Sequence, residues 1–387
     1  MTVATPDLHL CIATGQNLAN LIPALQCGAQ EVWILETPDM RVRAGFLSDS
    51  LKSRDIKVKR IPFADDDVTT LHRQAESIAE MLDGRPVTIN LTGGTKLMTL
   101  ALTETLARQL ATDVNLAAHP HLVYTDTRHH RLDWLGPIAR SEPMRDQLRI
   151  NDILLAQGYR RQAASGGAEA AEWSRAADGR KALTRQLGDD AAQLARFFSP
   201  LNAMAHHAMN EGGPWRAEQQ LAFTPGGANA KLLRAAHAAG LLTWDEQTQV
   251  VFQDRSAAQY MGGGWIEEYA ALKISGMRPN EWAPRVLITS TDGHTPNELD
   301  AVVVHGNRML LVECKAAVVR ENDIADWIYK LSRLSQQVGG ALAQALLLSA
   351  RSIGDNHRQR AKEYGVHILA ADQLSTLPDY LRTWMKA

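Results

Sequence analysis

The chain has 387 residues, of which 45% are hydrophobic and 22% are charged, and its formal net charge is −2. The length predicts two or three domains, and the composition is that of a folded globular protein, which excludes a disordered or collagen-like chain. A net charge near zero excludes a globally basic surface, so any contact with nucleic acid has to be local.

Signals for membrane insertion, export and disulfide formation are missing from the sequence. No run of about 18 consecutive apolar residues occurs, and the first residues lack the basic start and apolar core of a signal peptide. The three cysteines, Cys11, Cys27 and Cys314, are far apart and form no CxxC pair. We therefore expect a cytoplasmic protein that makes no membrane contact.

The first 140 residues alternate short apolar runs with amphipathic stretches, which is typical of βαβ units around a parallel sheet. The expected strands are Leu8–Thr14, Glu31–Glu36, Ile56–Ile61, Val87–Leu91 and Leu122–Thr125, and the expected helices include Asp66–Leu82 and Thr95–Leu110. Ligands of open parallel sheets bind beyond the carboxyl ends of the strands. The segments after Ala13 and Leu91 should therefore lie close together at one edge of the sheet.

Residues 141–262 are rich in alanine and arginine and are interrupted by glycine-rich segments, which predicts a helical middle region. Within it, residues 230–242 favour a helix and Thr243–Asp254 favours a hairpin. A helix followed by a two-stranded wing suggests a winged-helix module. An ordinary helical linker is the alternative interpretation.

Residues 263–387 read as a second α/β domain. We expect strands at Arg285–Thr289, Leu299–Val304, Met309–Lys315, Ala345–Leu348 and Val366–Leu369, and helices at Trp265–Ile274, Glu321–Val338 and Asn356–Tyr364 followed by a terminal helix.

Two of these strands form a predicted hairpin around Gly306-Asn307, because glycine at the first loop position suits a two-residue type II′ turn. The turn places His305 opposite Arg308, and the same register places Asp300 opposite Glu313. Carboxylates that face each other directly are destabilising unless something compensates them. Mg²⁺ or Mn²⁺, which prefer carboxylate oxygens, would do so, and we predict a metal site at this pair.

Lys315 lies on the same strand face as Glu313, and the register places it opposite Glu298. A lysine beside a bound metal can orient an attacking water or stabilise a pentacovalent phosphate. The alternative is a solvated strand face with a Glu298–Lys315 ion pair. The continuously apolar runs that flank these residues predict strands buried on both faces, which favours a functional role for the charged ends.

The spacing of Asp300, Glu313 and Lys315 resembles the PD-(D/E)XK nuclease superfamily, although leucine precedes Asp300 where that superfamily often has proline. The superfamily often adds a glutamate from a preceding helix. Glu267 is our choice for that carboxylate, with Glu268 as the alternative. The resemblance implies catalytic roles for Glu267, Asp300, Glu313 and Lys315.

The N-terminal part has its own candidate site in the loop Thr92-Gly93-Gly94-Thr95-Lys96, which follows a strand and precedes a helix. Glycines let a ligand approach the backbone, Thr95 can cap the helix, and free N–H groups at a helix start attract phosphate. The earlier loop Thr14-Gly15-Gln16-Asn17 offers amide and hydroxyl groups that can read a base or a ribose. The alternative is a tight strand-to-helix turn with a capping threonine. The candidate ligand-binding residues are Thr14, Gly15, Gln16, Asn17, Thr92, Gly93, Gly94, Thr95, Lys96 and Met98.

Together these loops, and above all the Asn-x-Thr-Gly-Gly-Thr-Lys-x-Met string that ends at Met98, resemble the CARF domain, a Rossmann-like domain that senses cyclic oligoadenylate. A CARF domain followed by a PD-(D/E)XK domain resembles the ancillary nucleases of type III CRISPR systems. The predicted organisation is a CARF sensor domain (1–140), a helical, winged-helix or linker region (141–262) and a restriction-endonuclease-like nuclease domain (263–387).

This resemblance implies a homodimer that binds a cyclic oligoadenylate, most often cyclic tetra-adenylate, in a composite site, and then cleaves nucleic acid with Mn²⁺ or Mg²⁺ in antiviral defence. The substrate would be single-stranded DNA, single-stranded RNA or supercoiled DNA that is nicked. The sequence leaves open the ring size of the activator, the choice among these substrates and metals, and whether the sensor degrades its ligand. The alternative function is a ligand-sensing, DNA-binding transcription regulator with a structural C-terminal domain.

Overall fold

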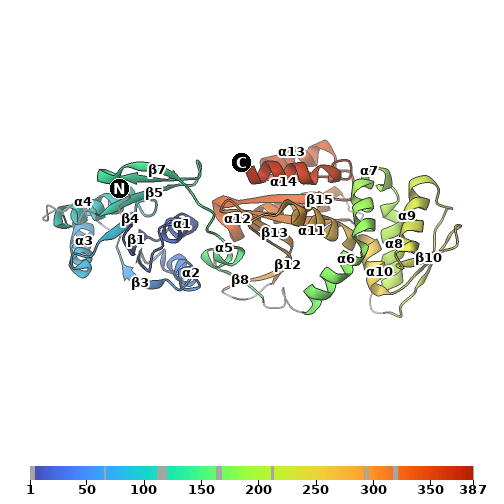
Figure 1. The fold of residues 1–387 in the computed structure, drawn as a ribbon, viewed down its shortest axis with the longest axis horizontal. Helices are drawn as coiled ribbons and strands as arrows, with labels where there is room; N and C mark the ends of the chain where they lie inside the picture. Colours follow the sequence, from blue (N-terminus) through green and yellow to red (C-terminus); the bar gives the residue numbers. More distant parts are fainter. Residues whose placement is uncertain are drawn as a thin grey trace.

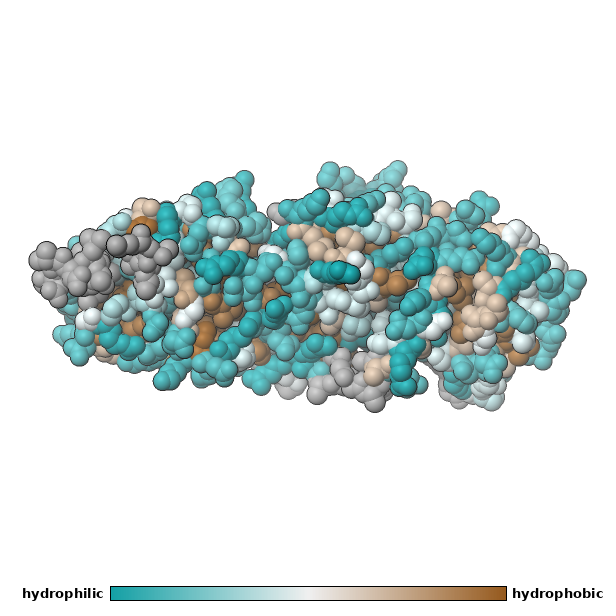
Figure 2. Space-filling model, viewed as in Figure 1, coloured by the Kyte–Doolittle hydropathy of each residue, from teal (hydrophilic) through white to brown (hydrophobic). Residues whose placement is uncertain are grey.

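The computed structural model describes residues 5–386, except for 65–66, 111–119, 163–167, 211–212, 292, 294–295 and 317–320. The chain forms an elongated molecule with three parts in a row (Figure 1). The N-terminal α/β part lies at one end, the C-terminal α/β part lies in the centre, and the helical middle region lies at the other end. The face shown in Figure 2 is largely hydrophilic, with hydrophobic side chains in small separate patches.

The N-terminal part is built on a sheet whose order is β3-β2-β1-β4-β5-β6-β7 within the described residues. Its strands are β1 (Leu8–Ile12), β2 (Glu31–Glu36), β3 (Lys57–Pro62), β4 (Val87–Asn90), β5 (His121–Asp126), β6 (Arg131–Leu135) and β7 (Arg140–Pro143). Its helices are α1 (Leu18–Gln26), α2 (Arg41–Lys52), α3 (Val68–Leu82) and α4 (Lys96–Leu110). The core residues of α1 and α2 pack on one face of the sheet, and those of α3 and α4 pack on the other.

Strands β1 to β5 pair in parallel, as predicted, and their ends lie within two residues of the predicted ends. Asp66, where one predicted helix begins, lies outside the described residues. The antiparallel strands β6 and β7 were not predicted. They are short and rich in charged residues, β7 is largely exposed, and β6 has only Leu132 and Trp134 buried, so neither carries an apolar run that would indicate a strand.

The middle region contains α6 (Ala168–Asp189), α7 (Ala191–Leu194), α8 (Phe198–Met209), β9 (Glu218–Gln220), α9 (Gly227–Ala238), β10 (Leu242–Trp244), β11 (Gln249–Phe252) and α10 (Arg255–Gln259). The predicted helix and hairpin are present as α9 and β10–β11, and β9 adds a third strand to the hairpin. The region lies on the far side of the C-terminal part from the sensor (Figure 1). The elements from α6 to α10 are therefore not a spacer between the two α/β parts, and only the first residues of the predicted region, around α5, connect them.

The C-terminal part is built on a sheet of order β16-β15-β14-β13-β12-β8. Its strands are β8 (Tyr159–Arg161), β12 (Glu281–Ser290), β13 (Asn297–His305), β14 (Arg308–Lys315), β15 (Ala343–Ser349) and β16 (Val366–Leu369). Core residues of α11 (Trp265–Met277) and α14 (Leu377–Lys386) cover one face, and those of α12 (Glu321–Gly339) and α13 (Asp355–Glu363) cover the other. The three-residue strand β8 comes from the segment that we assigned to the middle region, but it pairs with β12. The first strand of the C-terminal sheet therefore precedes helix α6 in the chain.

The β13–β14 hairpin has the predicted pairing of His305 with Arg308, and this register continues to Ala301 and Val312. The turn differs from the prediction, because Gly306 and Asn307 both have φ of +60°. Two positive φ values define a type I′ turn, whereas type II′ has one. The Asn307 side chain accepts hydrogen bonds from the backbone N–H groups of Gln147 (2.8 Å) and Leu148 (3.0 Å). These bonds tie the hairpin to the segment that enters from the sensor.

Helix α5 (Ile150–Ala156) joins the two α/β parts directly. It contacts α1 and α2 of the sensor as well as α12 and β13 of the C-terminal part. Its apolar residues, such as Ile153, belong to one hydrophobic cluster with Leu47 of α2 and Ile328 of α12. Arg54, two residues after the end of α2, pairs with the buried Asp152 of α5 at 2.6 Å. Helix α5 therefore links the N-terminal helices to the C-terminal sheet by direct packing, without the middle region.

Among the described residues, we find no helix with the length and apolarity needed to span a membrane.

Candidate active site

The predicted carboxylates lie beside a cavity of about 250 Å³ where β13 meets the first turn of α11. Glu267 of α11 and Asp300 of β13 both line it, together with Glu298 and Arg285. Three segments that are far apart in the sequence line the cavity. They are α6, the stretch from the kinked segment Tyr260–Gly264 into α11, and the strands β12 and β13. This convergence makes the cavity the candidate active site.

Asp300 sits where the regular pairing of β13 with β14 ends. The last paired residues are Ala301 and Val312, so Asp300 and Glu313 do not form the next ladder pair that we predicted. Instead, Asp300 Oδ2 accepts a hydrogen bond of 2.6 Å from the backbone N–H of Cys314. Burial, together with the negative charges of Glu313 and Glu267, raises the pKa of Asp300 to about 8. The predicted repulsion between the carboxylates is therefore present, although the regular strand pairing ends one residue before them.

Lys315 forms an ion pair with Glu313 on its own strand rather than with Glu298 across the hairpin. Its ammonium also lies over the ring of Trp327, 5.6 Å from the ring centroid. Burial alone would lower the pKa of Lys315, but the charges of Glu313 and Asp300 outweigh burial and raise it. The ammonium is thus held charged beside the acidic pair. Glu298 is engaged elsewhere, with Arg285 at 3.2 Å, so the solvated Glu298–Lys315 pair of the alternative interpretation is not formed.

The structure distinguishes the two neighbouring glutamates of α11. Glu268 has a side chain only 2% exposed and is paired with Arg180 of α6, whose guanidinium also lies over the ring of Tyr260. Glu267 lines the cavity, and burial raises its pKa, with Glu298 adding a smaller upward contribution. The charge of Glu268 is therefore already compensated, and Glu267 is the glutamate that remains available beside Asp300.

The run Gly262-Gly263-Gly264, which we read as a domain boundary, is a kink packed against the end of β14. Gly263 has φ of +144°, and a Cβ built there would lie 2.9 Å from the Cβ of Ala316. Asn202 of α8 donates a 2.8 Å hydrogen bond to the carbonyl of the same Ala316. Only glycine fits this close approach, which fixes where α11 begins and therefore where Glu267 lies.

The donor atoms at this site suit a hard divalent cation. Asp300 and Glu313 offer carboxylate oxygens, whereas the Cys314 thiol faces the hydrophobic core and has a raised pKa because it is buried. Within the part of the chain that the structure describes, no three His, Cys, Asp or Glu side chains are grouped tightly enough to bind a metal ion by themselves. Two carboxylates are nevertheless the set with which Mg²⁺ usually binds, because it retains several waters. The residues present therefore fit Mg²⁺ or Mn²⁺.

In the sensor, the loops after β1 and β4 meet as predicted, at the point where the strand order reverses. Buried side chains hold them together. Asn90 Nδ2 donates to Asn20 Oδ1 at 2.9 Å, and Asn20 Nδ2 donates to the carbonyl of Ile12 at 2.9 Å. Thr92 Oγ1 donates to Asn90 Oδ1 at 2.7 Å and accepts from the backbone N–H of Thr125 at 2.8 Å. Asn20 and Thr125 were not predicted, because isolated polar residues beside buried strands give no motif.

The predicted ligand-binding residues fall into exposed and buried groups. The exposed or half-exposed ones are Thr14, Gly15, Gln16, Thr92, Gly94, Thr95 and Lys96. Thr95 also accepts a 3.2 Å hydrogen bond from the backbone N–H of Met98, which is the predicted helix cap. Gly93 is buried so closely that a Cβ would lie 2.1 Å from the carbonyl oxygen of Ile12, so this glycine sets the position of the loop.

Two predicted ligand-binding residues face away from the loop surface. Met98 is 2% exposed and packs in the core beneath α4. Asn17 is fully buried, and its Nδ2 donates to the carbonyls of Arg43 (2.8 Å) and Ala156 (2.9 Å). Ala156 is the last residue of α5, so Asn17 connects the loop after β1 to the helix between the two α/β parts. We therefore correct both assignments: Met98 is a core residue and Asn17 is a connecting residue.

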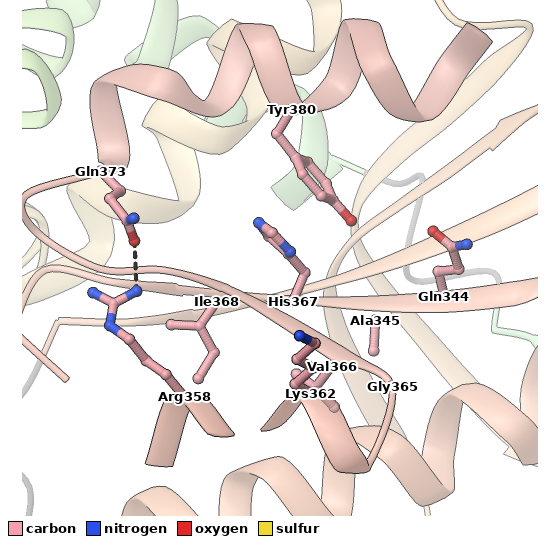
Figure 3. Close-up of a pocket in the computed structure, with 10 residues that line it drawn as sticks. All are labelled: Gln344, Ala345, Arg358, Lys362, Gly365, Val366, His367, Ile368, Gln373 and Tyr380. Carbon is pink, nitrogen blue, oxygen red and sulfur yellow. Dashed lines mark hydrogen bonds between the residues drawn. The ribbon is translucent and has the colours of Figure 1, made fainter. Parts of the chain in front are cut away.

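A separate pocket of about 560 Å³ lies at the edge strand β16 (Figure 3). Its basic side chains include Arg358, which donates to Gln373 Oε1 at 2.5 Å. Gln344 in its wall is the second residue of β15, whereas Ser349 at the other end of that strand pairs with Lys315. The pocket thus lies toward the opposite end of the strands, and no carboxylate lines it. It does not offer the chemistry of the carboxylate site.

Family models match both α/β parts. Residues 8–119 match the Card1 CARF domain, and residues 254–387 match the Card1-like endonuclease domain. No curated protein matched the chain.

Solved structures share the fold over the whole chain. Protein VC1899 from Vibrio cholerae has a TM-score of 0.83 and 20% identity, with 98% of each chain covered. Can2 from Sulfobacillus thermosulfidooxidans, in complex with cyclic tetra-adenylate (cA4), has a TM-score of 0.77 and 20% identity, with 98% of this chain and 99% of Can2 covered. A type III CRISPR defence DNA nuclease activated by cyclic oligoadenylate has a TM-score of 0.57 and 16% identity, with 100% of this chain and 52% of that chain covered. The chain therefore combines a domain that matches the Card1 CARF domain with a domain that matches the Card1-like endonuclease domain.

Proposed function

We propose that this protein is a metal-dependent nuclease that cyclic oligoadenylate switches on, and that it cleaves single-stranded DNA, single-stranded RNA or both. The observation that carries the proposal is the cluster of Glu267, Asp300, Glu313 and Lys315 at one end of the C-terminal sheet, in which a buried carboxyl has its pKa raised to about 8. A structural domain gains nothing from such a cluster, whereas a divalent cation would neutralise it. The same argument disfavours a transcription regulator with an inert C-terminal domain.

Each member of the cluster has a proposed task. Asp300 and Glu313 would hold the cation, which when bound would supply a water of lowered pKa and stabilise charge on a phosphoryl oxygen. The Lys315 ammonium, held beside the acidic pair by Glu313, orients the attacking water and balances negative charge on the phosphate. Glu267 completes the acidic wall of the cavity.

The raised pKa of Asp300 makes the stability of the metal-free protein depend on pH. The pKa rises from about 3.9 in an unfolded chain to about 8 in the folded protein. The carboxyl therefore stabilises the folded protein below about pH 4, and this contribution is lost as the pH rises toward 8.

The substitution Asp300→Asn tests this pH dependence, because it removes the titration and keeps an acceptor for the Cys314 N–H. In EDTA, we expect the Tm advantage of Asp300→Asn over the parent to grow by several degrees between pH 5 and pH 8. An advantage that is the same at both pH values would contradict the raised pKa.

For the sensor, we propose that the activator is cyclic tetra-adenylate, the ligand that the similarly folded Can2 holds. The exposed loop residues Gln16, Thr95 and Lys96 would bind it at the strand-order reversal. Backbone N–H groups at the start of α4 and the Lys96 ammonium suit its phosphates. Hydrolysis of the cyclic tetra-adenylate ring at this site is not part of the proposal.

A second copy of the chain would complete this site. Leu97 and Leu100 directly follow the loop on α4 and are 57% and 62% exposed, which is unusual for leucines on neighbouring turns of one helix. We propose that they pack against the same helix of a partner, so that two loops face one ligand. Leu100→Asp should convert a dimer into a monomer in light scattering and reduce the affinity for cyclic tetra-adenylate. A variant that remains dimeric would place the interface elsewhere.

Asn17 is proposed to transmit the signal rather than bind the ligand. Its two hydrogen bonds couple the loop after β1 to α2 and to α5, which packs on the nuclease sheet. We expect Asn17→Ala to lower the maximal activation by cyclic tetra-adenylate about 10-fold and to change ligand affinity less than about 3-fold, consistent with losing buried hydrogen bonds. The neighbouring Gln16→Ala is the matched control, because Gln16 is exposed and should mainly affect affinity. If Asn17→Ala instead weakens binding and leaves maximal activation intact, Asn17 is part of the ligand site.

The nuclease proposal is tested with a substrate panel. Single-stranded DNA, single-stranded RNA, a duplex and supercoiled plasmid are incubated with the full-length protein and cyclic tetra-adenylate, in Mn²⁺, in Mg²⁺ and in EDTA. We expect cleavage of at least one single strand in the presence of a metal and none in EDTA. Cleavage that persists in EDTA would rule out the metal-dependent mechanism, and no cleavage of any substrate would rule out the nuclease.

A further inference from the structure

A second cavity, of about 230 Å³, lies in a groove between α6 and α11. It shares two wall residues, Trp173 and Glu268, with the cavity that contains Asp300. The two cavities are therefore neighbours, and the indole of Trp173 lies at their boundary. A group bound in the groove would be next to whatever occupies the carboxylate cavity.

The groove has the chemical character of a site for an aromatic ring. Trp173 and Trp282 are both half-buried in its wall, and Ala177 and Leu272 add further apolar surface. Its volume is several times the roughly 30 Å³ that one water occupies. Such a space suits a single planar ring and is too small for a base pair.

The charges around the groove are compatible with an anionic strand. The carboxylate of Glu268 is compensated by Arg180, and Asp178 at the rim lies 3.9 Å from the ammonium of Lys181. The acidic groups of the wall are thus each accompanied by a cation.

The pocket at β16 in Figure 3 also has basic and aromatic side chains. It shares no lining residue with the carboxylate cavity, however, so a group bound there would not be next to the carboxylates.

We propose that this groove binds an unpaired nucleobase of the substrate strand, stacked on Trp173, next to the phosphate that is cleaved. The proposal rests on the nuclease function proposed above and explains how that function selects single strands. A base can enter the groove only when it is free of its partner strand, and stacking on an indole is tolerant of base identity. Trp173 is then a specificity-determining residue that comes from α6, outside the endonuclease fold itself.

The first test measures binding without cleavage. Anisotropy of a labelled single strand is recorded in EDTA with cyclic tetra-adenylate, for the parent, Trp173→Ala, Trp173→Phe and the control Trp215→Ala. Trp215 is also half-buried in the middle region but lines neither cavity. We expect Trp173→Ala to weaken binding about 10-fold or more, the usual loss for one stacked base, and Trp173→Phe to recover most of it. Equal binding by the parent and Trp173→Ala would overturn the proposal.

The second test maps cleavage of a single strand that carries one abasic position. In the parent, the phosphates beside the abasic position should be skipped, whereas Trp173→Ala should cut all positions at a similar low rate. Unchanged cleavage at the abasic position in the parent would also overturn the proposal. A parent that binds the strand through Trp173 but cleaves nothing would refute the nuclease function and leave the base site standing, so the two failures can be told apart.

Discussion

Replacing Asp300 with asparagine should abolish cleavage, with a rate at least about 1,000-fold below that of the parent. Asparagine has nearly the same shape and still offers an oxygen to the Cys314 N–H, so the end of β13 should keep its geometry. What is lost is the negative charge that would hold the cation together with Glu313. Single-turnover cleavage of a labelled single strand in Mn²⁺ measures the effect, and calorimetric binding of cyclic tetra-adenylate should be unchanged.

Glu298→Gln is the matched control for this substitution. Glu298 lines the same cavity, but its carboxylate is engaged with Arg285 at 3.2 Å. Removing its charge should therefore alter the rate less than about 3-fold, the scale of an exposed ion pair. If Asp300→Asn cleaves as fast as the parent, or if Glu298→Gln is the inactive variant, the assignment of the metal-binding carboxylates is wrong.

Replacing Lys96 with alanine should raise the concentration of cyclic tetra-adenylate needed for half-maximal activation by about 10- to 100-fold, the usual value of a hydrogen bond from a charged donor to phosphate. Lys96 is exposed and is the first residue of α4, at the N-terminal end of the helix, where the helix dipole favours an anion. Titration of the activator in the cleavage assay measures the shift. The cleavage rate at saturating activator should approach that of the parent, because Lys96 is far from the carboxylate cluster in the fold (Figure 1).

Lys57→Ala serves as the control for the lysine substitution. Lys57 is also exposed, but it begins the edge strand β3, at the opposite end of the strands from the loops. Its removal should leave the titration curve in place. A curve that shifts equally for both variants would mean that overall positive charge, and not the α4 loop, attracts the activator.

The sequence predicted the parts of the fold in which local pattern and tertiary environment agree. The buried parallel strands around Leu10 and Leu346 are apolar runs bounded by turns, and both were found where expected. Charged or short strands such as Arg140–Pro143 and Tyr159–Arg161 were missed. They are strands because they pair with β6 and β12 at the edge of a sheet, and their own residues do not favour this conformation.

The candidate site was predicted in composition and only partly in geometry. Strand spacing and the position of the turn brought Asp300, Glu313 and Lys315 into one region, whereas Glu267 was assigned from the resemblance to the nuclease superfamily. The sequence favoured Glu267 over Glu268 without a physical reason, because the difference between them depends on Arg180, a residue of α6 that is distant in the chain. The same limit applies to Asn17, whose partner Ala156 lies on another element. Pairings of this kind follow from the packing of helices and leave no periodic signal.

The gating of cleavage can be measured in one experiment: the initial rate at which the full-length protein cleaves a single strand in Mn²⁺, with saturating cyclic tetra-adenylate and without it. Because the sensor loop reaches the nuclease sheet through Asn17 and α5, we expect the rate with the activator to exceed the rate without it by at least about 10-fold, the scale of allosteric couplings of 1–3 kcal/mol. Equal rates in the two conditions would contradict control of the carboxylate cluster by the sensor.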